Sequence, residues 1–567
     1  MTITTGAMAT GQEGRTTAWD AAVKELRAGL PAWQAAPLEE RIALLREMRR
    51  RVGQEAAGFV AASSAAQSLG SHGTWVTEHW STLFVMAQAA RSLERVLGRI
   101  AEGRDPLPPR AVRRRPDGQV VVDVFPVGWD ERLLFAGYHA EVWMPPGRSV
   151  EQVRAGAAAA YRGAGFDRPG VALLLAAGNV ASLVVTDVLH LLYGEGCVVA
   201  VKMNPVLGYA RPAMERILAP FVTRGWVRFV HETVQAGEYL AAHPGIDRIH
   251  MTGSAATYNA LVWGVGDDAA RNRAAATPLL DKPFTAELGG VAPLIVVPGP
   301  WSQGDLRRQA DRIVYAKLFN CGHVCASPQV LVLPDGWPLA EPLLDEIRVL
   351  MREAEPREPY YPGSQARVGR ALADQPHAEP LLGPNHRVLV TGLDPADDST
   401  LFRDEVFADL LGVVRLPGRT VEAYLTEATR FANERLAGTL ATTMLVDPVT
   451  AKDHAWALDR AVADLRYGAI GINEWAIMSI NFGYGTWGGF PGHTPQAIGS
   501  GIGTVANAFQ LREPQKTVLT YAFRPRLKPL TSVTNRTAGT TIRRVLAYWT
   551  SDDLRHLPAA AASAIRG

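Results

Sequence analysis

The sequence predicts an α/β protein built on doubly wound parallel sheets. Short apolar runs such as Val171–Leu175 and Cys197–Val201 alternate with helical segments such as Ala210–Phe221. Strands separated by helices pair in parallel through crossovers, which is typical of nucleotide-binding sheets. The chain has 567 residues, more than one hydrophobic core usually supports, so we expect two or three domains.

The elements follow in order along the chain. Residues 15–102 are predicted to be helical, because apolar residues recur at a spacing of three to four between charged ones. Residues 119–144 are rich in valine and predict a strand pair that projects from the main body. Alternating strands and helices occupy the middle, and a second alternating block runs from Leu294 to Asn473. A last strand is expected at Thr517–Phe523, followed by a less regular basic tail.

The composition limits the classes of function. The chain has 58 lysine and arginine residues and 56 aspartate and glutamate residues, so its net charge is +2. This charge gives no electrostatic field that would attract nucleic acid. The basic run Arg110–Arg115 is interpreted as a solvated loop. Three cysteines are too few for a disulfide framework and favour a reducing compartment. The N-terminus lacks the pattern of a signal peptide, and no apolar run is long enough for a bilayer. We therefore expect a cytoplasmic enzyme with no membrane partner.

Polar and glycine residues follow three of the predicted strands. Asn179 lies just beyond one strand, Lys202 just beyond the next, and Thr252-Gly253-Ser254 follows a third and opens a helix. The carboxyl ends of parallel strands meet at one edge, where ligands bind, and a helix N-terminus offers backbone N–H groups to phosphate. The pattern predicts a nucleotide site, although each feature alone is weak.

A thiol and a carboxylate flanked by glycines predict covalent chemistry on a carbonyl. The thiol is Cys325, in the stretch Phe319–Cys325, and the carboxylate is Glu287, which opens a Glu-Leu-Gly-Gly run. A thiolate attacks a carbonyl carbon, and a carboxylate prepares the water that releases the product. Cys321 is interpreted as a packing residue that, if helical, shares a face with Cys325 and allows a redox pairing. The cysteines and one adjacent histidine do not make a convincing metal site, so none is predicted.

Together these residues resemble the aldehyde dehydrogenase superfamily over about residues 18–520. The family's cysteine motif Phe-x-Asn-x-Gly-Gln-x-Cys has a counterpart in residues 319–325, and its Glu-Leu-Gly-Gly motif is intact at Glu287–Gly290. Its Phe-Thr-Gly-Ser turn is similar to residues 251–254, and its Glu-x-Phe motif to Glu405-Val406-Phe407. Its cofactor lysine and oxyanion asparagine match Lys202 and Asn179.

The resemblance implies a fold of three parts. Residues 15–117 and 146–285 would form a nucleotide-binding domain, and residues 286–485 a catalytic domain. Residues 118–145 and 510–567 would form a small β extension for oligomerisation and a C-terminal tail. Homodimers or homotetramers would follow from strands added across subunits.

The resemblance also implies the reaction, which is NAD- or NADP-dependent oxidation of an aldehyde to a carboxylic acid. Cys325 would form a thiohemiacetal and then a thioester, Asn179 would hold the oxyanion, and Glu287 would activate the hydrolytic water. Lys202, Gly253, Ser254 and Glu405 would bind the cofactor.

Several positions depart from the family pattern. His323 replaces the usual glutamine and is expected to alter local charge or hydrogen bonding, and Ala408-Asp409 replaces a Gly-Pro pair. Tyr258 stands where a glycine is expected and predicts a changed approach of the pyrophosphate. Pro205 replaces a glutamate that would repel a 2′-phosphate, so NADP is not excluded.

Two alternatives stay open from the sequence. One is a coenzyme-A-acylating enzyme, which Pro205 favours weakly and intact Glu287 disfavours. The other is a non-catalytic homologue that acts as a scaffold. The substrate is not specified, although aromatic residues in the loops are compatible with a bulky apolar aldehyde; they are Trp129, Trp143, Trp475, Phe482 and Trp487.

Overall fold

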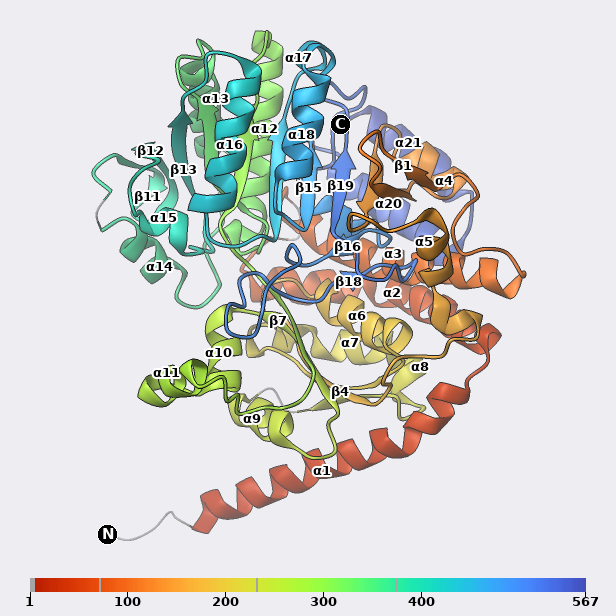
Figure 1. The fold of residues 1–567 in the computed structure, drawn as a ribbon. Helices are drawn as coiled ribbons and strands as arrows, with labels where there is room; N and C mark the ends of the chain where they lie inside the picture. The colour runs from red at the N-terminus through yellow and green to blue at the C-terminus, as the bar shows by residue number, and fades with distance from the viewer. Residues whose placement is uncertain (1–5, 71–72, 231–232, 374) are drawn as a thin grey trace.

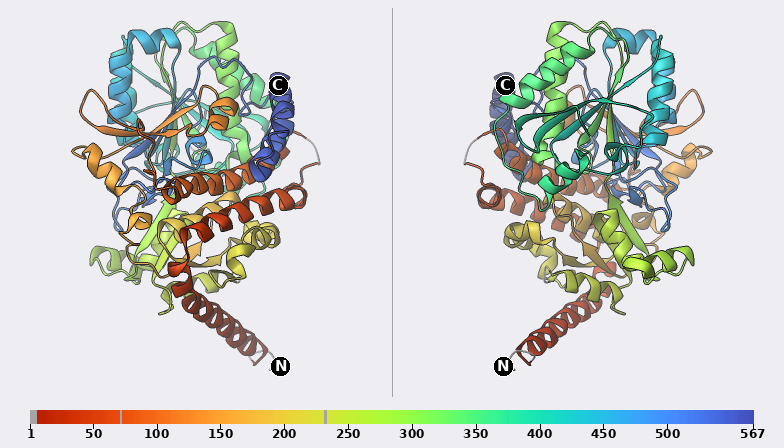
Figure 2. Two further views of the ribbon diagram at one scale, coloured as in Figure 1. Left: turned by 90° about the vertical axis from the view of Figure 1, so that its right-hand side faces the viewer. Right: turned by 90° about the vertical axis from the view of Figure 1, so that its left-hand side faces the viewer.

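Two mixed β-sheets, one above the other in Figure 1, organise the chain. The structure is a computed structural model and describes residues 6–70, 73–230, 233–373 and 375–567. Three long helices precede the first strand: α1 (Gly6–Ala35), α2 (Leu38–Ala66) and α3 (Val76–Ala101). They confirm the predicted helical segment, and the start of α1 extends away from the rest of the molecule (Figure 2).

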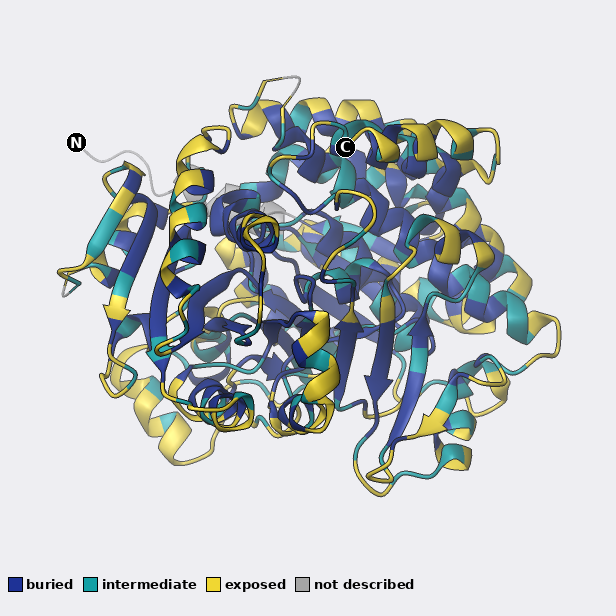
Figure 3. Ribbon diagram, turned by 90° about the horizontal axis from the view of Figure 1, so that it is seen from above, coloured by how far each residue is buried: buried dark blue, intermediate teal, exposed yellow. Residues whose placement is uncertain are grey.

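The smaller sheet has six strands in the order β17-β8-β7-β4-β5-β6. Its strands are β4 (Val171–Leu175), β5 (Val198–Lys202), β6 (Val227–Val230), β7 (Arg248–Gly253), β8 (Phe284–Leu288) and β17 (Gly501–Ile502). All neighbouring pairs from β6 to β8 are parallel, and β17 adds antiparallel to β8. Every residue of β4 is buried, as expected for a parallel sheet that is covered on both faces. Figure 3 shows buried strands surrounded by helices whose outer surfaces are exposed.

The larger sheet has eleven strands in the order β1-β2-β3-β19-β15-β14-β9-β10-β13-β12-β11. Its strands are β1 (Val112–Arg114), β2 (Val120–Phe125), β3 (His139–Trp143), β9 (Ala292–Val296), β10 (Pro328–Pro334), β11 (Ala378–Gly383), β12 (His386–Leu393), β13 (Leu410–Leu416), β14 (Ala441–Leu445), β15 (Ala469–Ile472) and β19 (Lys516–Thr520). The strands from β19 to β12 pair in parallel, whereas the pairs at both ends of the sheet are antiparallel.

Strand β10 shows how this sheet buries both faces. Val330 and Val332 pack with α16 (Val421–Arg435) and α18 (Ala455–Asp464) on one side. Leu331 and Leu333 pack with α12 (Gln303–Leu318) and α13 (Ala340–Glu353) on the other. Side chains alternate along a strand, so an unbroken apolar run fits a sheet that is covered on both faces.

Shorter elements complete the fold. The helices and turns between the strands are α4 (Trp129–Leu134), α5 (Val150–Gly156), α6 (Ser182–Leu189), η2 (His190–Gly194), α7 (Arg211–Ile217), α8 (Ala219–Val222), α9 (Val234–Ala242), α10 (Ala255–Trp263), α11 (Gly266–Ala274), η4 (Phe319–Gly322), α14 (Ser364–Ala371), α15 (Thr400–Arg403), α17 (Pro448–Asp453) and α19 (Met478–Asn481). Strands β16 (Thr486–Trp487) and β18 (Val505–Ala506) form a small antiparallel pair near the C-terminal end.

The predicted projecting strand pair and C-terminal tail differ from the structure in two ways. Hairpin β2–β3 forms, but β19 lies between β3 and β15 and joins the hairpin to the large sheet of the same chain. The tail is not irregular, because residues after β19 form helices α20 (Ala538–Ser551) and α21 (His556–Ile565). Trp549 of α20 is fully buried against Phe84 of α3, and this apolar contact holds α20 against α3.

Candidate active site

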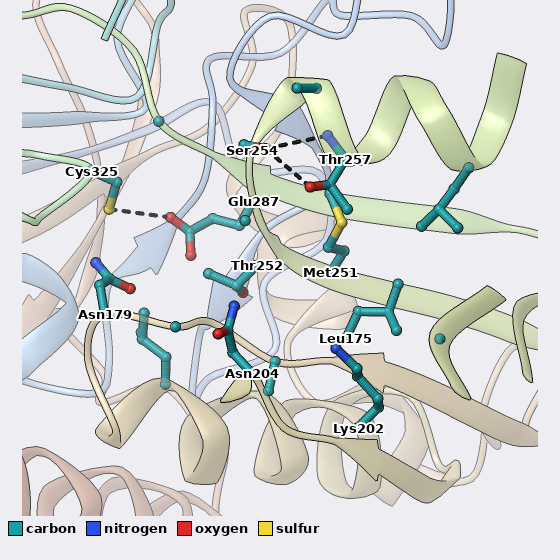
Figure 4. A pocket seen from close by; sticks show the side chains of 18 of the residues that line it. Leu175, Asn179, Lys202, Asn204, Met251, Thr252, Ser254, Thr257, Glu287 and Cys325 are labelled. Carbon is teal, nitrogen blue, oxygen red and sulfur yellow. Dashed lines mark hydrogen bonds between the residues drawn. The ribbon is translucent and has the colours of Figure 1, made fainter. Parts of the chain in front are cut away.

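One cavity of about 810 Å³ lies at the ends of β4, β5 and β7 and reaches the loop before β10. It is lined by all seven residues predicted to be catalytic or cofactor-binding, and Figure 4 shows most of them together. These residues are Asn179, Lys202, Gly253, Ser254, Glu287, Cys325 and Glu405. They come from both sheets, so the cavity depends on how the sheets meet.

A tight backbone turn presents Cys325. After α12 ends, Asn320 and Cys321 take left-handed conformations, with φ of 51° and 54°, and Gly322 follows with φ of 71°. A Cβ on Gly322 would lie 2.2 Å from the carbonyl oxygen of Ala408, so only glycine allows the loop to approach so closely. These conformations contradict the expectation that Cys321 shares a helical face with Cys325.

Cys321 faces away from the cavity. Its thiol is buried, donates to the carbonyl oxygen of Glu358 at 3.6 Å, and has a pKa raised by burial to about 12. Cys321 therefore fits the predicted packing role, and burial makes it a poor partner for a disulfide with Cys325.

Glu287 lies next to Cys325 in a buried setting. The Cys325 Sγ is 3.7 Å from Oε1 of Glu287, and Trp487 Nε1 donates to the same oxygen at 2.7 Å. Burial raises the pKa of Glu287 to about 7, against the opposing effect of the Trp487 and Cys325 hydrogen bonds. A carboxylate with a pKa near neutrality is poised to take and return protons.

The Cys325 thiol is a weak acid in this arrangement. Burial raises its pKa well above the usual value, and the negative charges of Glu287 and Glu405 raise it further. Glu287 is therefore positioned both to hold the thiol proton and to receive it when the sulfur attacks a carbon.

Asn179 is tied to the cysteine loop. Its side-chain amide donates to the carbonyl oxygen of His323 at 2.9 Å, and the Asn320 amide donates to the Asn179 carbonyl oxygen at 3.0 Å. An amide carries two N–H donors, so one remains for another acceptor. In Figure 4 the amide nitrogen of Asn179 points to the Cys325 side of the cavity.

His323 changes hydrogen bonding and leaves the local charge unchanged. Its Nδ1 lies 2.8 Å from the carbonyl oxygen of Phe407, and its ring stacks on the Phe407 ring. Burial lowers its pKa to about 3, so the ring is neutral at physiological pH. His323 thus joins the cysteine loop to the Glu405-Val406-Phe407 segment.

Glu405 packs against the glycines that follow Glu287. A Cβ on Gly289 would lie 2.3 Å from a carboxylate oxygen of Glu405, so a larger residue there would displace that carboxylate. The Oε1 of Glu405 is buried and has no hydrogen-bond partner among the described residues. Burial raises the pKa of Glu405 to about 8, against the opposing charge of Arg367.

The other end of the cavity is lined by Lys202, Pro205 and the start of α10. Ser254 caps α10 by accepting from the Thr257 backbone N–H at 3.2 Å, and Gly253 precedes it at the end of β7. Tyr258 does not enter this end, since it is buried against Phe284 with ring centroids 4.8 Å apart. The Tyr258 side chain is therefore not part of the cavity lining, and its predicted effect on the pyrophosphate approach stays a prediction.

Two roles at the cavity and its wall were not predicted from the sequence. Trp487 was considered only as an aromatic residue compatible with a bulky aldehyde, yet its indole N–H donates to Glu287. Glu238 on α9 brings a carboxylate to the Lys202 end, where Pro205 seemed to leave none. No spacing rule links either residue to the motifs, because each arrives from a separate element.

The aromatic residues proposed for the substrate site separate into groups. Trp475 and Trp487 share a buried apolar cluster with the partly buried Cys325. Trp143 is in the large-sheet core, Phe482 stacks on Phe125, and Trp129 is 58% exposed. Only Trp475 and Trp487 are therefore placed to contact a group bound at Cys325.

Within the described ranges, no group of three or more histidine, cysteine, aspartate or glutamate side chains is arranged to hold a metal ion. No helix among those residues has the length and apolar character needed to cross a membrane.

Comparison with known proteins gives concordant matches. The sequence profile of the "Aldehyde dehydrogenase family" matches residues 169–366. An N-succinylglutamate 5-semialdehyde dehydrogenase from Sphingopyxis alaskensis is 26% identical over 377 residues, which is 66% of this chain. The matched region spans only 60% of the length of that relative.

Solved structures share the fold. An NAD-dependent aldehyde dehydrogenase from Sinorhizobium meliloti is 17% identical with a TM-score of 0.60, covering 90% of this chain and 88% of its own. Aldehyde dehydrogenase C from Pseudomonas syringae, a mutant solved with NAD⁺ and octanal, is 17% identical with a TM-score of 0.60 and 90% coverage of both chains. Residues 169–366 thus match the aldehyde dehydrogenase family, and the chain as a whole shares the fold of solved aldehyde dehydrogenases.

Proposed function

We propose that this enzyme oxidises an aldehyde to a carboxylic acid with NAD or NADP, through a covalent intermediate on Cys325. The observation that carries the proposal is the 3.7 Å approach of Cys325 Sγ to Glu287 Oε1 in a cavity that also holds Asn179 and the nucleotide-site residues. A nucleophile and a base in contact are the parts that acyl chemistry requires.

The residues of the cavity fit a dinucleotide. Lys202 lines one end, and the Gly253–Ser254 turn opens α10 and presents backbone N–H groups, which suit ribose and phosphate. At the other end, Glu405 has a buried oxygen without a partner and can accept from a ribose hydroxyl. NAD(P), when bound, supplies an acceptor for the hydride of the substrate carbon.

The first chemical step belongs to Cys325 and Glu287. The Sγ–H bond breaks as Sγ bonds to the aldehyde carbon, and Glu287 receives the proton. The carbonyl oxygen becomes an oxyanion, which the free N–H of the Asn179 amide and the backbone N–H of Cys325 stabilise.

The second step releases the acid. After the carbon has lost its hydride, a thioester links the acyl group to Sγ. Glu287, once it is again ionised, takes a proton from water as the water oxygen attacks the thioester carbon. The C–S bond breaks, the carboxylic acid leaves, and the Cys325 thiolate takes back from Glu287 the proton that came from water, which restores the thiol.

Two further properties are proposed with the function. We expect a homodimer or homotetramer in the cytoplasm. Because β19 pairs within its own chain, an assembly would use surfaces other than the β3 and β15 edges. Light scattering on the purified protein measures the assembly.

One assay tests the function against its rivals. Purified protein is offered a panel of aldehydes with NAD or NADP, with and without coenzyme A, and both reduced cofactor and acid are measured. Acid formation without coenzyme A that is lost in Cys325→Ala supports the proposal. Strict dependence on coenzyme A would identify an acylating enzyme instead, and neither turnover nor cofactor binding would indicate a scaffold.

A further inference from the structure

A row of buried polar side chains leads from Glu287 away from the catalytic cavity. Strands β7 and β8 pair in parallel, with His250 opposite Thr285 and Thr252 opposite Glu287. Opposite residues share a face of the sheet, as do residues two apart, so these four side chains form one polar patch. Figure 4 shows Thr252 beside Glu287 at one end of it.

Helix α6 places a carboxyl over this patch. Asp187 is fully buried, and its Oδ2 accepts a hydrogen bond from Thr252 Oγ1 at 2.9 Å. His250 Nε2 lies 4.0 Å from the same oxygen, and His250 Nδ1 lies 2.8 Å from Thr285 Oγ1. Side chains that can donate or accept a proton therefore follow one another from Glu287 to Thr285.

The row ends at a second cleft. This cleft, about 1320 Å³ in volume, is lined by Thr285, Thr186, His190 and Glu195, and it does not include Glu287. A π-helical turn, η2, continues α6 and carries His190, whose ring lies 5.8 Å from that of His250. Single π-helical turns occur often at functional sites.

Burying this row of polar side chains destabilises the fold, so packing alone does not explain why these residues are present. Asp187 Oδ1 and His250 Nε2 are buried without hydrogen-bond partners among the described residues. Unpaired buried polar atoms destabilise a fold, whereas the matching positions of a sheet–helix contact are usually apolar. Burial leaves both groups neutral, since it raises the pKa of Asp187 well above its usual range and lowers that of His250 to about 3.

Titratable or charged groups face His250 from each neighbouring element. Asp187 comes from α6 and His190 from η2, while Arg248 comes from β7 itself and pairs with Glu195 beyond η2. This setting connects the row to charged, partly exposed groups at the cleft.

The reaction requires a route by which a proton leaves Glu287. This requirement rests on the proposed function. Glu287 receives one proton from the Cys325 thiol and later a second from water, so the first must leave between the two steps. A bound cofactor would occupy part of the cavity at that stage, and Glu287 is only 2% exposed. We propose that Thr252, Asp187, His250 and Thr285 carry protons from Glu287 to the second cleft.

The transfer balances with proton movements alone. Glu287 Oε2 has no hydrogen-bond partner among the described residues, so one water molecule or a rotation of the carboxyl carries its proton to the Thr252 oxygen. Thr252 gives its own proton to Asp187, and a carboxyl proton of Asp187 passes to His250 Nε2. A rotation of the imidazole or one water molecule bridges the 4.0 Å gap. The Nδ1 proton passes to Thr285, whose hydroxyl proton leaves to water in the cleft. One proton leaves the row for each that enters it. Rotation of the hydroxyls and of the imidazole ring then restores the original positions of the protons.

Rapid mixing with aldehyde and NAD(P) tests the path, since it separates the first turnover from later ones. Asp187→Asn, His250→Gln and Thr285→Val are expected to form the first equivalent of reduced cofactor at the wild-type rate. Their kcat should fall on the order of tenfold, with a larger solvent deuterium isotope effect on kcat. Thr285→Ser, which restores the hydroxyl, should restore kcat.

A matched control is Thr442→Val, which removes a buried threonine hydroxyl of β14, outside the row. Equal kcat and isotope effect in the wild type and all three variants would overturn the path, as would an equal loss of the first turnover and of kcat. If Asp187→Asn or His250→Gln does not fold, Thr285→Val decides. Absence of any first turnover in the wild type would instead reject the proposed function.

Discussion

The indole N–H of Trp487 donates a 2.7 Å hydrogen bond to Oε1 of Glu287. That oxygen is also the one nearest to the Cys325 sulfur, so the indole fixes the carboxylate on the side of the thiol. The same bond opposes the effect of burial on the pKa of Glu287. One residue thus sets both the position and the acidity of the proposed base.

Trp487→Phe should raise the pKa of Glu287, because the change removes a hydrogen bond that favours the ionised form. The rising limb of the kcat–pH profile should move to higher pH, away from its expected place near pH 7. Loss of the bond should also lower stability by about 1–3 kcal/mol. Steady-state kinetics from pH 5.5 to 9 measure the first effect, and chemical denaturation measures the second.

Trp475→Phe is the control for this change. Its indole N–H also makes a buried bond, to the Ala326 carbonyl oxygen at 2.8 Å, but does not touch Glu287. It should lose similar stability while its profile keeps the wild-type midpoint. Coincident profiles for the two variants would contradict the role given to Trp487.

Glu287→Gln should make Cys325 more reactive to alkylation while it abolishes hydrolysis. The glutamate raises the pKa of the thiol through its charge and its hydrogen bond, so the amide should increase the thiolate fraction. Mass spectrometry after iodoacetamide treatment at pH 8.5 identifies the modified cysteine. Cys197 and Cys321, both buried, should react more slowly in both proteins; slower alkylation of Cys325 in Glu287→Gln would disprove the electrostatic account.

Glu405 should make the folded protein less stable as pH rises. Burial raises its pKa to about 8 from the ordinary value of 4.5, so the folded state binds a proton that the unfolded state releases. The stability from this group is complete below about pH 4.5 and is lost as pH rises to about 8. Melting temperatures from pH 5 to 8 should therefore fall less steeply in Glu405→Gln. The exposed change Glu102→Gln should keep the wild-type slope.

Glu238 should favour NAD over NADP. The side chain is exposed at the Lys202 end of the cavity, where a carboxylate repels a 2′-phosphate. Exposed charges interact by about 1 kcal/mol, so Glu238→Gln should raise the NADP/NAD ratio of kcat/KM roughly fivefold. Glu215→Gln, a change on α7 outside the cavity, provides the matched control. An unchanged ratio in Glu238→Gln would remove this residue from cofactor selection.

Local patterns in the sequence predicted the parts of the site that lie at strand ends. Asn179 follows β4, and Lys202 and Gly253 end β5 and β7. Parallel pairing alone brings such positions to one edge of the sheet. The neighbourhood of Cys325 was harder to predict. Trp487 reaches Glu287 across 200 residues. The left-handed turn at Asn320 and Cys321 leads into Gly322, which lies against the distant Ala408 backbone.

The same limit explains the C-terminal region. Helix α20 has an apolar face, but its partner α3 lies far earlier in the chain. The spacing of apolar residues therefore does not predict where α20 packs. Strand β19 was expected as a strand, and its neighbours β15 and β3 became known only from the fold.

The position of β19 affects how the protein completes folding during synthesis. Strand β3 leaves the ribosome early, yet its partner on the large sheet begins only at Lys516. Until that residue emerges, the hairpin and β15 both carry unpaired edges that can bind other strands. Nascent chains that stall or end before β19 should therefore be prone to aggregation. The last step of folding is the insertion of one short strand between the unpaired edges of β3 and β15.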